Sequence, residues 1–160
     1  MYRLGRFAAL TEQHGFVHGF STREEENLSF RHGEQPRRDV IFARTRFMHA
    51  VHPSFHPHYG VAMVSMQAGR EEAIHYVGSS FFGKGMCQPD SGPYCEAMIA
   101  KDGFLFGVAG DCPQILICDP VGRVFALVHA GRESTVREIS RKTVGIMINA
   151  FKVNPRNLVV

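Results

Sequence analysis

The clearest hydrophobic pattern lies in the middle of the chain, where two apolar runs flank a turn sequence. Ile115–Cys118 and Val124–Val128 are continuous apolar runs, which are typical of buried strands. Asp119-Pro120-Val121-Gly122 lies between them, and Pro in its second position with Gly in its fourth favours a type I turn. The pattern therefore predicts a β-hairpin that brings the residues before its first strand beside the residues after its second.

Shorter apolar runs predict the rest of the strands. The expected strands are 16–22, 61–67 paired with 73–77, 96–100 and 104–108. Residues 78–93, which are rich in Gly, Ser and Pro, are expected to form a loop. The last residues, Leu158-Val159-Val160, begin what the pattern predicts to be another buried strand. Because the sequence stops inside that strand, we expect a single domain over 1–160 whose carboxy-terminal part is missing.

Helical spacing of apolar residues predicts two helices. One spans 36–51, with a proline near its start where the missing N–H is harmless. The other follows His129, with Thr135 and Glu138 as a capping box. Its expected inward stripe consists of Val136, Ile139, Thr143, Ile146, Met147 and Ala150. Strands and helices together predict an α+β domain, a layered mixed β-sheet with flanking helices.

Composition and charge exclude several classes of partner. The 160 residues carry a net charge of +3, and their Lys and Arg are scattered, which indicates no nucleic-acid partner. No apolar run is long enough to span a membrane, and the N-terminus lacks the apolar core of a signal peptide. We therefore expect a cytoplasmic protein without a membrane partner, whose four cysteines stay reduced.

Two short motifs at the ends of the predicted hairpin carry candidate chemistry. Gly110-Asp111-Cys112-Pro113 precedes its first strand, and His129-Ala130-Gly131 follows its second. A thiol and an imidazole held together can ligate zinc, or can act as nucleophile and base. A buried apolar Cys112 and a surface His129 remain an equal alternative from the pattern alone.

Several motifs in one order resemble the bacterial laccase-domain proteins, once labelled multicopper polyphenol oxidoreductases and now regarded as zinc-dependent purine nucleoside enzymes. The resemblance rests on 18–23 (His-Gly-Phe-Ser-Thr-Arg), 27–29, 33–34, 66–67, 96–99, 110–113, 118–120 and 129–132. It implies the Cys/His hydrolase fold of that family, here without its carboxy-terminal part. It also implies Cys112 and His129 as catalytic residues and metal ligands, and Arg23 as a contact for phosphate or substrate.

The sequence departs from the family at the metal set, which the resemblance gives as two histidines and one cysteine. Gly69 stands in Gln67-Ala68-Gly69-Arg70, where the family has the first histidine. His75 is a possible substitute ligand, although an ordinary strand residue is the simpler interpretation. A catalytic zinc usually has three protein ligands, so a site with two should hold the metal weakly.

The function implied by the resemblance is zinc-assisted attack of phosphate or water on purine nucleosides, with copper as a less favoured metal. Its substrates would be adenosine, inosine, guanosine or methylthioadenosine, with phosphate as co-substrate. Three alternatives stay open: a metal-free Cys/His amidase that edits peptidoglycan precursors, an inactive relative, and a small-molecule binding module. The sequence does not determine the oligomeric state.

Overall fold

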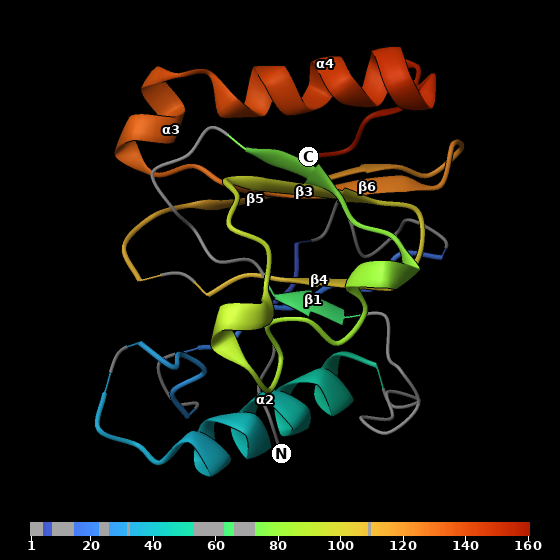
Figure 1. The fold of residues 1–160 in the computed structure, drawn as a ribbon. Coiled ribbons are helices and arrows are strands. Elements are labelled where there is room, and N and C mark those ends of the chain that lie inside the picture. The colour runs from blue at the N-terminus through green and yellow to red at the C-terminus, as the bar shows by residue number, and fades with distance from the viewer. Residues whose placement is uncertain are drawn as a thin grey trace. The chain divides into compact units, whose positions relative to one another are not determined.

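A computed structural model describes residues 5–7, 15–22, 26–31, 33–52, 63–65, 73–108 and 110–160. The chain divides into two compact units, residues 1–61 and 62–160. Figure 1 shows the helices and strands along the chain. The expected single domain with a missing carboxy-terminal part stays a prediction. The candidate chemistry lies in the second unit.

Helix α2 (Arg37–Val51) forms the regular part of the first unit and confirms the helix predicted over 36–51. Its buried side includes Val40, Phe47 and Met48, spaced as the sequence pattern requires. Arg44 is also buried, and its Nε donates to the backbone oxygen of Leu28 at 2.7 Å. The segment 16–22 is not a strand: among its residues only Phe20 forms an isolated bridge, to Gly5.

The second unit is built on a four-stranded mixed sheet in the order β2-β3-β6-β5. Its strands are β2 (Ile74–Tyr76), β3 (Ala97–Ala100), β5 (Gln114–Asp119) and β6 (Val124–His129). β2 is parallel to β3, and the other neighbours are antiparallel. This mixed sheet with helices confirms the α+β class.

The hairpin β5–β6 confirms the two predicted central strands and the turn region between them. Asp119 pairs with Val124, leaving residues 120–123 as the loop. Asp119 Oδ1 accepts a hydrogen bond from the backbone N–H of Val121 at 3.0 Å, and Arg123 takes a positive φ of 52°. A side-chain turn followed by a left-handed residue closes the loop, which fixes the pairing at the far end of both strands.

The remaining strands pair differently from the prediction. β1 (Met63–Ser65) lies parallel to β4 (Phe104–Phe106) in a small sheet, whereas β2 pairs with β3. The expected pair of 61–67 with 73–77 is therefore wrong. Parallel neighbours are joined by long connections, so the sequence between two strands gives little sign of their pairing. The predicted loop over 78–93 contains two short 3₁₀ helices, η1 (Ser79–Phe81) and η2 (Pro89–Ser91).

The helix predicted after His129 is broken into α3 (Arg132–Val136) and α4 (Ile139–Phe151). Glu138 lies at the break with φ 58°, and its side chain makes no capping hydrogen bond. The predicted capping box is therefore wrong, because Thr135 Oγ1 donates instead to the backbone oxygen of Ala130 at 3.2 Å. The break also shifts the inward stripe. Ile139, Thr143 and Met147 are buried, but Val136, Ile146 and Ala150 are exposed.

The four-stranded sheet is covered on both faces (Figure 1). On one face α4 packs through Ile139 and Met147 against Ala97, Ile99 and Val128. On the other face Met98 and Leu127 pack with partly buried side chains that include Leu105 of β4. Side chains alternate between the two faces along a strand. His129 therefore lies on the same face as Leu127, opposite α4.

The last residues run along the outer side of β5. After η3 (Pro155–Asn157), Val159 forms an isolated antiparallel bridge to Cys118, with hydrogen bonds of 2.9 Å in both directions. None of the helices in the described residues has the length and apolar character needed to cross a membrane.

Candidate functional site

The hairpin brings its two end motifs together, as the sequence predicts. Gln114 pairs with His129 in the β5–β6 register, and the backbone N–H of Ala130 donates to the oxygen of Pro113 at 2.9 Å. Cys112 directly precedes this hydrogen bond on one side, and His129 precedes it on the other. The backbones that carry the thiol and the imidazole are therefore neighbours at this edge of the sheet.

Glu96, which directly precedes the adjacent strand β3, holds His129 in place. The backbone N–H of His129 donates to the backbone oxygen of Glu96 at 2.8 Å, and His129 Nδ1 lies 2.6 Å from Glu96 Oε2. Both side chains are largely buried, with exposed fractions of 17% for His129 and 8% for Glu96. Because a carboxylate only accepts, Nδ1 carries the proton of this bond. Nε2 is then the imidazole atom left for a metal ion or for proton transfer.

Two acidic groups keep the Cys112 thiol protonated. Partial burial raises the pKa of Cys112, and the charge of Asp111 raises it further. The thiol also donates to Asp111 Oδ1 at a sulfur–oxygen distance of 3.7 Å, and the charge of Glu96 acts in the same direction. A free thiolate is thus disfavoured here, whereas a cation placed among these groups would be attracted by all of them.

Backbone close to the imidazole fixes the position of the ring. A Cβ added to Gly131 would lie 2.9 Å from His129 Cε1, so only glycine fits there without moving the ring. Ser134 of α3 donates from Oγ to the backbone oxygens of His129 and Gly131, at 2.9 and 3.0 Å. The turn from β6 into α3 therefore restrains both the backbone and the ring of His129.

Gln114 places a second polar group beside His129. Its position opposite His129 in the register directs both side chains to the same face of the sheet. Both polar atoms of its amide are buried and have no hydrogen-bond partner in the described part of the chain. A Cβ on Gly107 would lie 2.7 Å from Gln114 Oε1, so the backbone of Gly107 closes one side of the amide. A buried donor and a buried acceptor are thus available to a ligand next to His129.

The described residues supply an incomplete set of zinc ligands. Cys112 offers a thiol, and His129 offers an imidazole whose other nitrogen is held by a carboxylate, as is usual for a metal-bound histidine. No group of three His, Cys, Asp or Glu suited to a metal is found among the described residues. His75 pairs with Met98, and its ring lies against Phe81 at a centroid distance of 6.3 Å.

The structure describes some of the site residues predicted from the sequence and not others. Cys112 and His129 lie at one edge of the sheet, as expected. His75 is not gathered with them into a described metal group. Arg23 and Gly69 lie outside the described residues. The assignment of catalytic, substrate and metal roles to these residues stays a prediction.

Sequence reasoning missed Glu96 and Gln114 as site residues. The available signal for Glu96 was a carboxylate directly before the wholly apolar strand Ala97–Ala100, where a buried charge needs a partner. For Gln114 the signal was weaker, because a polar residue at the start of a strand is ordinary. Both roles become visible only through the register with β6.

A family model matches most of the chain, and solved structures share its fold. The family described as multi-copper polyphenol oxidoreductase laccase matches residues 8–160. No curated protein matches. Among solved structures, hypothetical protein YfiH from Bacillus licheniformis is similar with a TM-score of 0.74 and 21% identity, over 82% of this chain and 48% of that one.

Two further structures extend the comparison. YlmD from Geobacillus stearothermophilus gives a TM-score of 0.74 and 20% identity, over 91% of this chain and 53% of that one. The Neisseria meningitidis protein NMB0706 gives a TM-score of 0.59 and 19% identity, over 82% of this chain and 47% of that one. The chain thus spans about half the length of the structures that it resembles.

Proposed function

The chain belongs to the multi-copper polyphenol oxidoreductase laccase family, and from that premise we propose that it acts on purine nucleosides at the site around His129. The proposed reactions are phosphorolysis of adenosine, inosine, guanosine or methylthioadenosine, and deamination of adenosine. The observation that supports this most is the 2.6 Å contact between His129 Nδ1 and Glu96 Oε2, which leaves Nε2 free. We also propose a cytoplasmic setting, where free thiols persist.

The proposal gives each residue of the site one task. Cys112 Sγ and His129 Nε2 are the atoms that would hold a zinc ion, with His75 as a further possible ligand. Zinc, when bound, supplies a Lewis acid and lowers the pKa of a bound water. Glu96 keeps the His129 ring in one orientation and stabilises its protonated form during proton transfer. Gln114 offers its amide to the polar edge of a base or a ribose.

The charges at Cys112 distinguish this proposal from a metal-free Cys/His amidase. An amidase of that kind needs a thiolate, usually formed beside a positive group. Partial burial, with the charges of Asp111 and Glu96, instead raises the pKa of the Cys112 thiol, which favours its neutral form. The same negative groups favour a bound cation. The site therefore supports a metal-assisted reaction better than it supports a cysteine nucleophile.

A nucleoside assay with phosphate tests the proposal. Each of the four nucleosides is incubated with the zinc-supplemented chain, and free base and deaminated product are measured. We expect slow turnover, because Gly69 replaces the first family histidine, and we expect His129→Ala to reduce it about 100-fold, as loss of a proton-transfer group does. Cys112→Ala should reduce turnover as well, whereas Cys87→Ser, which changes an exposed thiol outside the site, should leave it unchanged.

Two results would contradict the proposal. Amide hydrolysis that survives a chelator but is lost in Cys112→Ala would establish the amidase instead. Absence of turnover with all four nucleosides, even after Gly69→His and zinc, would identify an inactive relative.

A further inference from the structure

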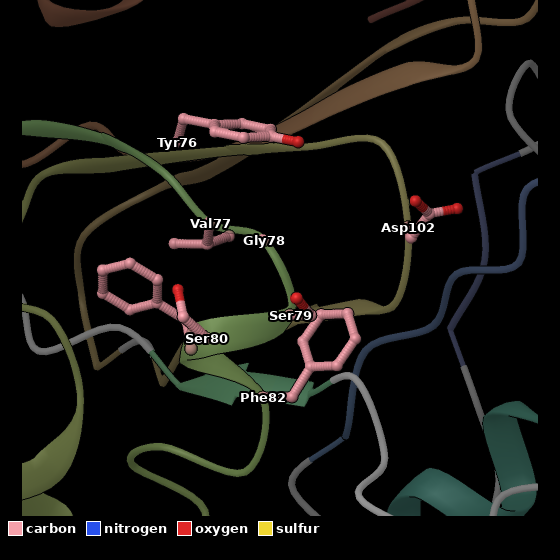
Figure 2. Close-up of a pocket in the computed structure, with 8 residues that line it drawn as sticks. Tyr76, Val77, Gly78, Ser79, Ser80, Phe82 and Asp102 are labelled. Carbon is pink, nitrogen blue, oxygen red and sulfur yellow. The ribbon is translucent and has the colours of Figure 1, made fainter.

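A separate cavity of about 530 Å³ lies in the second unit, within the size range of small-molecule sites. We call it the Tyr76 pocket. It is lined by Tyr76, Val77, Gly78, Ser79, Ser80, Phe81, Phe82 and Asp102. Figure 2 shows the ring of Tyr76 above and the ring of Phe82 below the backbone of Val77 and Gly78, with the carboxylate of Asp102 to the right of both.

The Tyr76 pocket is distinct from the site around His129. Glu96, which holds His129, directly precedes β3, whereas Asp102 lies just after the end of the same strand. Tyr76 is the last residue of β2, which runs parallel to β3. The pocket and the His129 site therefore lie at opposite ends of β3.

The polar groups of the Tyr76 pocket favour a positively charged ligand. Asp102 lies in the exposed turn between β3 and β4, and its carboxylate has no ion-pair partner among the described residues. Ser79 and Ser80 add hydroxyl groups that can accept from an ammonium group. A carboxylate and two hydroxyl oxygens that line one pocket are suitable counterparts for an amine.

The aromatic rings around the Tyr76 pocket already hold ammonium groups of the chain itself. Lys84 Nζ lies 4.8 Å from the centroid of Phe81, and Lys101 Nζ lies 5.6 Å from the centroid of Phe151. Phe151 in turn contacts the Tyr76 ring at a centroid distance of 5.1 Å. No lysine or arginine of the described residues is found over Tyr76 or Phe82.

We propose that the Tyr76 pocket binds a small organic amine in its protonated form, carried on an aromatic or alkyl body. The body would pack between Tyr76 and Phe82, where half of the Tyr76 surface (52%) is exposed. The ammonium group would lie at the Asp102 carboxylate, with the π-faces adding to the attraction. The two lysines remain over Phe81 and Phe151.

Titration of the 160-residue chain with three matched probes, followed by backbone amide NMR, tests the proposal. The probes are phenethylamine, 2-phenylethanol and 3-phenylpropanoate, which share a phenyl ring and differ in charge. We expect phenethylamine to shift the amides of 76–82 and 102, and to bind about tenfold more tightly than the alcohol, a ratio worth ~1.4 kcal/mol. The carboxylate should bind most weakly.

Variants show whether the named residues carry the binding. Asp102→Asn should reduce phenethylamine affinity about tenfold, to the level of the alcohol, because it removes the charge and keeps the shape. Glu133→Gln removes one acidic charge from exposed α3 and should change nothing. Gly78→Val should block all three probes, because Gly78 lines the pocket and the added side chain would lie against the Tyr76 ring, with its Cβ 3.8 Å away.

The proposal is overturned if phenethylamine and 2-phenylethanol bind equally, or if Asp102→Asn leaves amine affinity unchanged. Preference for the carboxylate probe would show instead that Lys84 and Lys101 dominate the pocket. Loss of nucleoside turnover has no bearing on these results, because neither Asp102 nor Gly78 belongs to the His129 site.

Discussion

Glu96→Ala is expected to be the most damaging single change at the site. It leaves the largely buried imidazole of His129 without its partner, and a hydrogen bond to a charged group contributes about 1.5–3 kcal/mol to stability. For a chain of this length each kcal/mol corresponds to about 2–4 °C in Tm. Thermal unfolding followed by circular dichroism should therefore show a Tm lower by several degrees, together with loss of nucleoside turnover.

Glu96→Gln separates the role of Glu96 in folding from its role in the reaction. The amide oxygen of glutamine still accepts from Nδ1–H, so Tm should fall much less than with alanine. The charge that stabilises a protonated imidazole is lost, and turnover should fall about 10- to 100-fold, as for other partners of this kind. Equal turnover in Glu96→Gln and the unchanged chain would show that Glu96 is purely structural. Gly131→Ala tests independently whether turnover depends on the position of the His129 ring. It displaces the ring and keeps Glu96, so turnover should fall in this variant as well.

The second large effect concerns zinc. With Cys112 and His129 as the expected ligands and Gly69 in place of a third, purified protein should bind zinc substoichiometrically. Cys112→Ala should remove most of the bound zinc. Gly69→His should raise zinc affinity by at least ~10-fold, because even outer-shell partners contribute that much. Isothermal titration with zinc measures the affinity and stoichiometry of the unchanged chain, Cys112→Ala and Gly69→His. Cys87→Ser serves as a thiol control outside the site.

Tight one-to-one zinc in the unchanged chain would contradict the expectation of a weak two-ligand site. His75→Ala would then be the first variant to test, because His75 was the alternative third ligand. Retention of full zinc binding in Cys112→Ala would place the metal elsewhere.

The parts of the fold that the sequence predicts are those in which neighbours in the chain decide the structure. The β5–β6 hairpin follows from two apolar runs and the turn at Asp119, and helix α2 follows from its apolar spacing. The pairing of β2 with β3 and of β1 with β4 was not predicted, because parallel pairing depends on contacts between distant segments.

The break between α3 and α4 shows a different limit. Thr135 and Glu138 fit the spacing of a capping box, and the residues around them favour a helix. Hydrogen bonds within the turn after β6 favour a break instead: Ser134 and Thr135 donate to the backbone of 129–131, and Glu138 takes the left-handed conformation. Local preference was therefore overridden by the turn that holds His129.

The candidate site divides in the same way. Cys112 and His129 were predictable, because the hairpin turn alone brings their segments together. Glu96 contacts His129 from just before β3, and Gln114 lies opposite His129 on β5, so their roles depend on the sheet register. A single glutamate before an apolar strand indicates only that a buried charge needs a partner, without identifying that partner.

The central claim is that Glu96 fixes the His129 imidazole with its proton on Nδ1 and leaves Nε2 free. Nitrogen-15 NMR of the histidine side chains, assigned with His129→Gln, tests this most directly. The account predicts a protonated Nδ1 and an unprotonated Nε2 at alkaline pH, with a change at Nε2 when zinc is added. A proton on Nε2, or a ring that exchanges freely between the Nδ1-protonated and the Nε2-protonated tautomers, would contradict it.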